Sequence, residues 1–345
     1  MTIGWARVTL IVLISLSATT SWANDIYISQ IGDDVTVTIT QDGDNNKIGA
    51  LGNLSNKGLL GSYGPSTYTY TQTGNNNTLG FYNADIGDSS SSLTQTGDDN
   101  DAIMDCHGED CTMSVTQLGD NNDAHAETGN SYANDGNTIT IYQEGDYNEA
   151  YAEANGDSND LDSYQESDNN FSRVVVSGNY NAVKAWQGKH EDGTVDVDET
   201  GDNEVYWIVN GDSNNLASYQ TDDNGNGGLH IANYITGDSN TVKHTQRGAG
   251  DHDGFIEIGG DNNDVELLQR GNSDTQFADI VLDGDGHTVD VFQRYGSHTA
   301  NIDLTNAGGG YNLDLDQTST ASGTYSVTGY CTNAAGCSLL VNDSN

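Results

Sequence analysis

A short phrase recurs along the chain: an alternating apolar stretch, then Gln-x-Gly, two polar residues and Asn. Clear copies begin at Gln41, Gln72, Gln95, Gln117 and Gln143, and in each copy the Asn follows five positions after the Gln. A phrase that returns at a regular interval indicates one small structural unit stacked many times. Such stacking dictates the whole architecture of a chain.

The glutamine recurs through the rest of the chain, more loosely after the first two of these positions: Gln165, Gln187, Gln220, Gln246, Gln269, Gln293 and Gln317. Insertions aside, the interval is roughly 22 to 26 residues, which we interpret as one coil. A further turn signal falls about halfway between successive phrases, for example at Gly156 after Gly145. Each coil therefore has two halves.

Within a half-coil, inward and outward residues alternate, as in Val37, Ile39 and Gln41. A period of two is a strand signal, and it places the Gln on the same face as the aliphatic residues. Gly followed by Asp, Asn or Ser is turn chemistry, because Gly reaches positive φ and Asx side chains bond their own backbone. The sequence thus predicts an all-β chain, a two-sheet parallel β-solenoid of stacked strand-turn-strand repeats.

On that geometry the inward amides decide the register. A buried amide costs free energy unless it is hydrogen-bonded, but identical amides stacked in register can donate and accept along a ladder. We predict that this ladder fixes register and supports self-assembly. Its predicted members are Gln30, Gln41, Asn46, Gln72, Asn77, Gln95, Asn100, Gln117, Asn122, Gln143, Asn148, Gln165, Asn170, Gln187, Gln246, Gln269, Gln293 and Gln317.

The extended phrase Gln-x-Gly-x-x-Asn-x-Ala, complete at residues 95–102, 117–124 and 143–150, resembles the curlin repeat. Curlin repeats build curli, the secreted amyloid fibres of bacterial biofilms, and the resemblance covers most of residues 26–327. It implies an exported structural subunit that stacks end to end into curli-like fibres of the cell surface or biofilm matrix. The implied partners are further copies of the chain, an outer-membrane export channel and a nucleator subunit. Family members generally have fewer coils and a Gly-rich leader, which this chain lacks.

The N-terminal segment predicts export. Residues 1–23 combine a lone Arg7, an apolar run at 8–16 and a small-x-small cleavage site ending at Ala23, which together form a secretory signal. The run is too short to span a bilayer, and no later segment could cross one. We expect a signal peptide at 1–23, curlin-like repeats at 24–329 and a disulfide-stapled tail at 330–345, in a protein that is secreted or held in a pilus-like fibre.

The formal charge of −42, from 52 acidic and 10 basic residues, excludes a generic affinity for nucleic acid or anionic lipid. Turn carboxylates such as Asp98, Asp120, Asp146 and Asp157 would stack at close spacing and repel by roughly 1 kcal/mol per pair even in water. Salt or Ca²⁺ could relieve that repulsion, whereas a solvated acidic surface requires no ion at all. We therefore expect no obligatory cofactor and leave Ca²⁺ as the alternative.

The four cysteines form two close pairs, Cys106 with Cys111 and Cys331 with Cys337. In an exported chain such pairs predict local disulfides. A zinc site that includes His107 is the alternative for the first pair. The second pair is expected to staple the C-terminal tail.

The sequence does not favour an enzyme. The histidines, including His125, His190, His244 and His287, have no regular spacing relative to a Ser or Cys nucleophile, and we expect them to face solvent. The glycines mark turns, and no phosphate-binding loop occurs. The alternative to a fibre subunit is a monomeric surface adhesin of the same fold, stabilised by cations, whose C-terminal tail caps the stack.

Overall fold

The computed structural model describes residues 24–26, 29–32, 35–49, 58–62, 66–84, 89–106, 110–128, 136–188, 202–221, 228–271, 275–304, 311–320, 322–328 and 337–343. Every regular element in these ranges is a β-strand, and none of them contains a helix able to span a membrane. The predicted signal at 1–23 lies outside the described residues. The chain divides into two compact units, residues 1–161 and 162–345.

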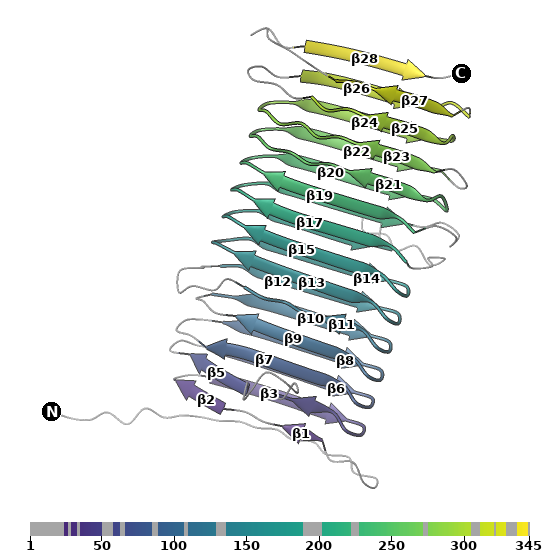
Figure 1. Cartoon of the computed structure of the whole chain (residues 1–345). Helices are drawn as coiled ribbons and strands as arrows, with labels where there is room; N and C mark the ends of the chain where they lie inside the picture. The colour runs from purple at the N-terminus through teal and green to yellow at the C-terminus, as the bar shows by residue number, and fades with distance from the viewer. Residues whose placement is uncertain are drawn as a thin grey trace, which may run out of the picture. The chain divides into compact units, whose positions relative to one another are not determined.

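In unit 1, the strands that carry the recurring glutamine form one parallel sheet, here called the Gln sheet (Figure 1). Neighbouring strands pair without slippage, so that Gln41, Gln72, Gln95, Gln117 and Gln143 are successive register partners. The strands, in spatial order, are β3 (Val35–Asp42), β6 (Ser66–Thr73), β8 (Ser90–Thr96), β10 (Thr112–Leu118) and β12 (Thr138–Glu144).

The strands between them form the facing sheet of unit 1, which is also parallel. It consists of β1 (Asp25–Ile26), β4 (Lys47–Ile48), β7 (Thr78–Ala84), β9 (Asp101–Cys106), β11 (Asp123–Ala124) and β13 (Glu149–Asn155). Two short strands join this sheet beside the later part of β7, namely β5 (Gly58–Ser62) and its partner β2 (Ser29–Gly32). From β3 onward, each coil thus contributes first to the Gln sheet and then to the facing sheet.

Unit 2 repeats the arrangement, and β14 (Asp160–Glu166) contains the boundary between the units. Its Gln sheet continues with β16 (Ala182–Gln187), β18 (Asn215–Thr221), β20 (Thr241–Arg247), β22 (Asp264–Arg270), β24 (Thr288–Arg294), β26 (Tyr311–Gln317) and β28 (Cys337–Asp343). Its facing sheet comprises β15 (Phe171–Ser177), β17 (Glu204–Asn210), β19 (His230–Thr236), β21 (His252–Phe255), β23 (Gln276–Asp279), β25 (His298–Asn301) and β27 (Gly323–Ser326).

The core lies between the two sheets of each unit, because alternate residues of every strand point inward. β12 shows the pattern, since Ile139, Ile141 and Gln143 are buried and the residues between them are only partly covered. In unit 2, Val205, Trp207 and Val209 occupy the same kind of positions. The predicted two-sheet parallel β-solenoid is confirmed.

Coil length follows the prediction except at two insertions. Most successive glutamines are 22 to 26 residues apart, but Gln41 and Gln72 are separated by 31 residues and Gln187 and Gln220 by 33. Each longer interval includes residues outside those described. The register of the flanking strands is unaffected, so the insertions lengthen a connection and leave the stack intact.

The turn glycines are required by close stacking. Gly74 has φ +111°, and a Cβ built on it would lie 2.0 Å from the carbonyl oxygen of Gly97 in the next coil. Two residues later, Asn76 has φ +60°, a left-handed conformation that Asn tolerates. The same left-handed position is filled by Asp99 and Tyr147 in other copies, so the turn geometry recurs even where Asn does not.

The C-terminal segment departs from the predicted domain boundary. Residues 337–343 form β28, which pairs with β26 in register and extends the Gln sheet by one strand. The stack therefore continues beyond residue 329, inside the segment 330–345 that the sequence assigned to a tail. Cys331 and the rest of that segment up to residue 336 lie outside the described residues.

Candidate assembly site: amide rows and terminal strands

The glutamines of unit 1 form a continuous row of side-chain hydrogen bonds inside the solenoid. Each Nε2 donates to the Oε1 of the Gln in the next coil, with N···O distances of 2.7 to 2.9 Å. All members of the row are at most 5% exposed. The row consists of Gln41, Gln72, Gln95, Gln117 and Gln143.

These amides also join the two sheets, which the sequence did not indicate. Gln95 Nε2 donates to the backbone carbonyl of Thr78 in the facing sheet at 3.0 Å, and Gln117 Nε2 donates to that of Asp101 at 2.9 Å. Each Gln thus bonds along the stack and across the core. A side chain that satisfies both donors in this way holds the register of two sheets together.

Unit 2 contains a second row of the same kind, with N···O distances of 2.9 to 3.1 Å. It includes Gln220, which was absent from the predicted ladder although its 33-residue separation from Gln187 preserves the register. The row consists of Gln165, Gln187, Gln220, Gln246, Gln269, Gln293 and Gln317.

The asparagine five positions after each Gln forms a second row at the first turn. The backbone N–H of Asn100 donates to Asn77 Oδ1 at 3.1 Å, and Asn100 Nδ2 donates to the carbonyl of Gly119 in the next coil at 2.7 Å. Asn46, Asn77 and Asn122 make equivalent bonds. The side chain therefore replaces backbone bonds that a tight turn would otherwise leave unmade.

This row begins one coil earlier than predicted. Asn24 Oδ1 accepts from the backbone N–H of Asn46 at 2.9 Å, and Asn24 Nδ2 donates to the carbonyl of Gly43 at 3.2 Å. It thus occupies the Asn position of the coil that precedes β3. Sequence analysis missed it because no Gln-x-Gly precedes Asn24.

Gln30 does not belong to the Gln row. It lies in β2, and its register partner is Leu60 in β5, so it is part of the facing sheet. The predicted stacking of Gln30 with Gln41 is therefore wrong. The phrase around Gln30 is also incomplete, because the position five residues later is Val35 and not Asn.

A third row of asparagines occupies the second turn of the coil and was not predicted. In unit 1, Asn159 donates from its backbone N–H to Asn137 Oδ1 at 2.9 Å. In unit 2 the equivalent row consists of Asn181, Asn214, Asn240 and Asn263. In unit 2 these asparagines end the pattern Gly-x-x-Asn, which is not preceded by a Gln. The second-turn Asn therefore occurs without the Gln phrase that accompanies the first-turn Asn.

The first-turn row changes character in unit 2. Asn203 stacks on Asn170 through a side-chain bond of 3.1 Å, as the sequence predicted for Asn170, but the next coils place Leu229 and then His252 at this position. His252 Nε2 lies 3.3 Å from the carbonyl of Arg247, which resembles the bond of a first-turn Asn to the carbonyl four residues back. Buried His can therefore substitute for Asn in this turn.

Four of the histidines were expected to face solvent but are buried, whereas His125 and His230 are partly exposed. His244, His252, His287 and His298 are each at most 1% exposed. His244 occupies the inward position between Ser218 and Leu267 of neighbouring strands, and burial lowers its pKa to about 3. Their inward register positions explain the burial, which charge and spacing alone could not predict. His190 lies outside the described residues.

The stacked acidic turns receive a stabilising contact that offsets their repulsion. The backbone N–H of Asp98 donates to Asp120 Oδ1 at 2.7 Å, and that of Asp120 donates to Asp146 Oδ1 at 2.7 Å. Unit 2 repeats the contact between Asp212 and Asp238. A carboxylate that accepts a backbone N–H forms a charge-assisted bond, so the acidic residues are part of the turn structure.

Carboxylates also stack on the outer surface of the facing sheet in unit 1. Asp101, Asp123 and Glu149 are successive register partners. Partial burial, and then the charge of Asp123, raise the pKa of Asp101 to about 6. Partial burial and the charge of Glu149 also raise the pKa of Asp123. Within the described residues, however, no group of three His, Cys, Asp or Glu side chains is arranged to hold a metal ion.

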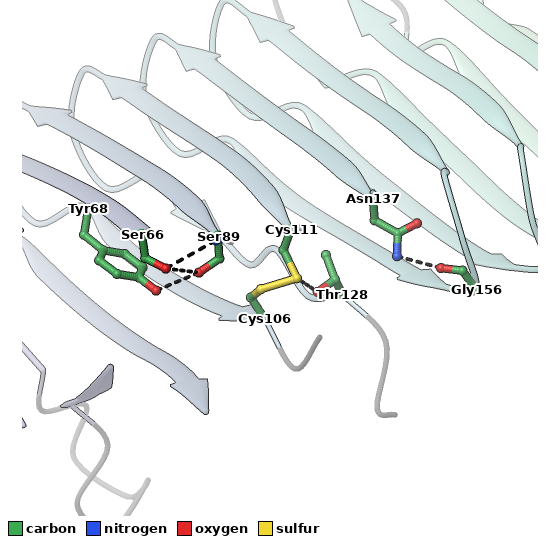
Figure 2. The surroundings of a disulfide bond; sticks show 8 residues. All are labelled: Ser66, Tyr68, Ser89, Cys106, Cys111, Thr128, Asn137 and Gly156. Carbon is green, nitrogen blue, oxygen red and sulfur yellow. Dashed lines mark hydrogen bonds between the residues drawn. A yellow bond between two sulfur atoms is a disulfide. The ribbon is translucent and has the colours of Figure 1, made fainter. Parts of the chain in front are cut away.

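Cys106 and Cys111 form the predicted local disulfide, which joins the end of β9 to the start of β10 (Figure 2). Cys111 Sγ also lies 3.2 Å from Thr128 Oγ1. The alternative zinc site is wrong, because both sulfur atoms are bonded to each other and cannot act as thiolate ligands. The second predicted disulfide includes Cys331, which lies outside the described residues, and remains a prediction.

The outermost described strands of the Gln sheet, β3 and β28, each have one side that no described strand covers. Among the described residues, no strand precedes β3 in the Gln sheet, and no group donates to the buried Gln41 Oε1. At the other end, Leu339 and Leu340 in β28 are 37% and 68% exposed. Open edges of this kind pair with further strands.

Residues 134–162 match the family described as the curlin associated repeat. This segment is similar to a curlin repeat. It spans β12, the turn with Gly145 and Asn148, and β13, and so contains one complete Gln phrase with both strands of a coil. The predicted resemblance is confirmed by this match. A search among curated proteins found no significant similarity to the chain.

The structure explains why the curlin repeat has its particular fixed positions. The Gln bonds along and across the core, the Gly permits close stacking of turns, and the Asn bonds to the turns of both adjacent coils. The final Ala is inward-facing, as Ala124 and Ala150 are buried and paired in adjacent strands. Each fixed position therefore has a structural role, and none of them forms a catalytic arrangement.

Proposed function

We propose that the chain is a secreted structural subunit that assembles end to end into curli-like amyloid fibres of the cell surface or biofilm matrix. The observation that carries the proposal is the N-terminal edge of the Gln sheet, where no described strand pairs with the outer side of β3 and no described group donates to Gln41 Oε1. A buried acceptor without a partner costs about 1–3 kcal/mol, and an added strand that brings a hydrogen-bond donor into register would relieve it. The edge therefore favours addition of another copy.

The C-terminal end bears on the alternative of a capped monomeric adhesin. In that alternative, the tail folds over the last coil and blocks further stacking. β28 instead continues the Gln sheet as another parallel strand, with its outward Leu340 exposed. This arrangement supports the fibre over the capped adhesin.

The remaining parts of the proposal follow from the curlin resemblance and the N-terminal segment. Export would follow removal of residues 1–23, through an outer-membrane channel, and a nucleator subunit would start the fibre. The strongly acidic surface would keep the chain soluble before assembly. The proposed role is structural and requires no catalysis.

The test is electron microscopy with fibre diffraction on the purified mature chain, residues 24–345. We expect unbranched fibres with reflections near ~4.7 Å and ~10 Å. Stable short particles that never elongate would refute the fibre role and favour the adhesin. Replacement of both Gln117 and Gln143 with Ala should slow fibre growth, and unchanged growth would count against a role of the Gln row in assembly.

A further inference from the structure

Three of the chain's few basic residues form one row in unit 2. Arg247, Arg270 and Arg294 end the Gln-sheet strands β20, β22 and β24 (Figure 1) and are successive register partners. The whole chain has 10 Lys and Arg residues against 52 Asp and Glu residues. In unit 1 the position directly after the Gln holds uncharged or acidic residues, such as Thr96 and Glu144. The three arginines, here called the Arg row, are therefore a local concentration of positive charge.

The Arg row points outward where the first turn begins. Each Arg follows a buried Gln, so strand alternation places it on the outer face, and Arg270 is exposed. Within the described residues, no carboxylate lies within ion-pair distance of Arg270 or Arg294. The nearest charged outward positions on these strands lie roughly 13 Å back, where Lys243 and Glu266 pair with each other at 3.0 Å. In the described parts of the three first turns, Asp251 is the single carboxylate.

The guanidinium groups of the Arg row are suited to carboxylates. Arg294 Cζ lies 4.3 Å from the centre of the Tyr295 ring, which orders the guanidinium and keeps its N–H groups at the rim. Three like charges that repeat once per coil repel one another. Carboxylates with the same spacing would relieve this repulsion and accept paired N–H bonds.

An acidic row with the same spacing lies at the second turn of the same coils. The backbone N–H of Asp238 donates to Asp261 Oδ1 at 2.8 Å, and that of Asp261 donates to Asp285 Oδ1 at 2.9 Å. These residues, here called the Asp row, precede β20, β22 and β24, so each strand runs from an Asp to an Arg. A strand of 7 residues spans roughly 23 Å, which is too far for the two rows of one copy to pair.

We propose that unit 2 binds a second copy of the chain side by side, with the Arg row of one copy against the Asp row of the other. Both rows repeat once per coil, so one correctly placed ion pair brings the other two into place. Each copy carries both rows, so the contact is heterologous and continues from copy to copy. It lies at the sides of the coils and is separate from end-to-end assembly.

The matched spacing favours a second copy over a flexible anionic polymer. The carboxylates of the Asp row are already held by backbone N–H bonds, so they lose little conformational freedom when they meet the Arg row. A flexible polymer would have to order its charged groups to match the coils. A second copy also neutralises the Asp row, which an anionic polymer would not.

The contact has to overcome the net charge of −42. At physiological ionic strength the screening length is about 8 Å, so the long-range repulsion between two copies is largely screened while charges in contact still attract. One exposed ion pair changes a binding constant by about two- to fivefold, and three pairs by about tenfold to a hundredfold. The contact between two single copies is therefore weak, and it grows where many copies lie alongside one another.

Two variants of the mature chain each remove one row while retaining the fold. The Arg-row variant carries Glu, a residue that unit 1 holds at this position as Glu144: Arg247→Glu, Arg270→Glu and Arg294→Glu. The Asp-row variant carries Asn, whose Oδ1 can still accept the turn N–H, as Asn75 Oδ1 does from Asp44: Asp238→Asn, Asp261→Asn and Asp285→Asn. The control is Lys184→Glu, which reverses an exposed charge on β16 of the same sheet.

Particles of each chain are grown separately at about 0.15 M salt and imaged by electron microscopy. We expect wild-type and Lys184→Glu particles to associate side by side, and each row variant alone to show about tenfold fewer such contacts. A mixture of the two row variants should regain contacts, in pairs only, because it combines one intact Arg row with one intact Asp row. Row variants that associate like the wild-type chain, or a mixture that stays single, would overturn the inference.

The same images separate this inference from the proposed fibre function. Long wild-type fibres that never lie side by side overturn the inference and leave the function standing. Short particles that associate side by side support the inference and refute the function. Labelled poly-L-glutamate probes the other occupant: if it binds single wild-type particles but not the Arg-row variant, the Arg row serves an anionic polymer and the second-copy contact is refuted.

Discussion

Gln95 offers the most direct measure of what the amide row contributes to stability. Its Nε2 donates to Gln117 Oε1 at 2.8 Å, and its side chain is fully buried. Replacement with Ala leaves Gln117 Oε1 buried without a donor, which costs about 1–3 kcal/mol. Loss of the buried side chain leaves a cavity that adds about 2 kcal/mol. Gln72 Nε2 retains its bond to the carbonyl of Lys47. The free energy of unfolding should therefore fall by about 3–5 kcal/mol.

The assay is urea unfolding of the monomeric chain followed by far-ultraviolet circular dichroism. Thr96→Ala is the matched control, because Thr96 is the exposed neighbour on the same strand and should change stability by less than about 0.5 kcal/mol. Gln95→Leu fills most of the cavity but removes the amide, so it isolates the hydrogen-bonding part. A Gln95→Leu variant as stable as the wild-type chain would refute the reasoning, since packing alone would then account for the row.

Four further predictions follow from single positions. Burial lowers the pKa of His244 from 6.5 to about 3, so the folded chain favours neutral His. The free energy of unfolding is therefore unaffected by His244 above pH 6.5 and falls by up to about 1.4 kcal/mol per pH unit as the pH drops toward 3. His244→Leu should remove this slope from pH-dependent unfolding curves. Tyr147 is 61% exposed with φ +61°, so Tyr147→Asn should raise the midpoint of thermal unfolding by relieving about 0.5–1 kcal/mol of backbone strain, and a lowered midpoint would contradict this. Gly97 has φ +123° and no room for a Cβ, so Gly97→Ala should destabilise the chain by about 2–3 kcal/mol or more in the same urea assay. Ca²⁺ should accelerate fibre growth at constant ionic strength by screening the turn carboxylates, and Asp120→Asn should reduce that acceleration; an identical response of both chains would exclude this turn as the place where the ion acts.

Much of the fold could be predicted from spacing, because a stacked repeat converts local sequence directly into structure. Gln117 and Gln143 lie in one row since each follows the same strand pattern and precedes the same turn. Their inward position follows from alternation with Val115 and Ile141. The same reasoning failed for Gln30, where Gln-x-Gly was accepted without the Asn that completes the phrase.

Other features depended on partners that the sequence does not identify. The bond from Gln95 to Thr78 O requires the distance between two sheets, and the contact from Asp98 N–H to Asp120 requires the stacking of two turns. The burial of His244 was likewise invisible, because a His at an inward strand position looks like any polar residue until the facing sheet covers it.

The sequence by itself determined the repeating unit: strands from a period of two, turns from Gly and Asx residues, and a register imposed by identical inward amides, all of which are local or repeat from coil to coil. Only the tertiary structure decided which buried polar groups have a hydrogen-bond partner and which do not. Among the described residues, Gln41 Oε1 lacks a donor because no strand pairs with the outer side of β3, not because its local sequence differs from that of the interior. Hydrogen bonds between coils join residues far apart in the chain, so the ends of the stack become distinct only when all the strands are in place.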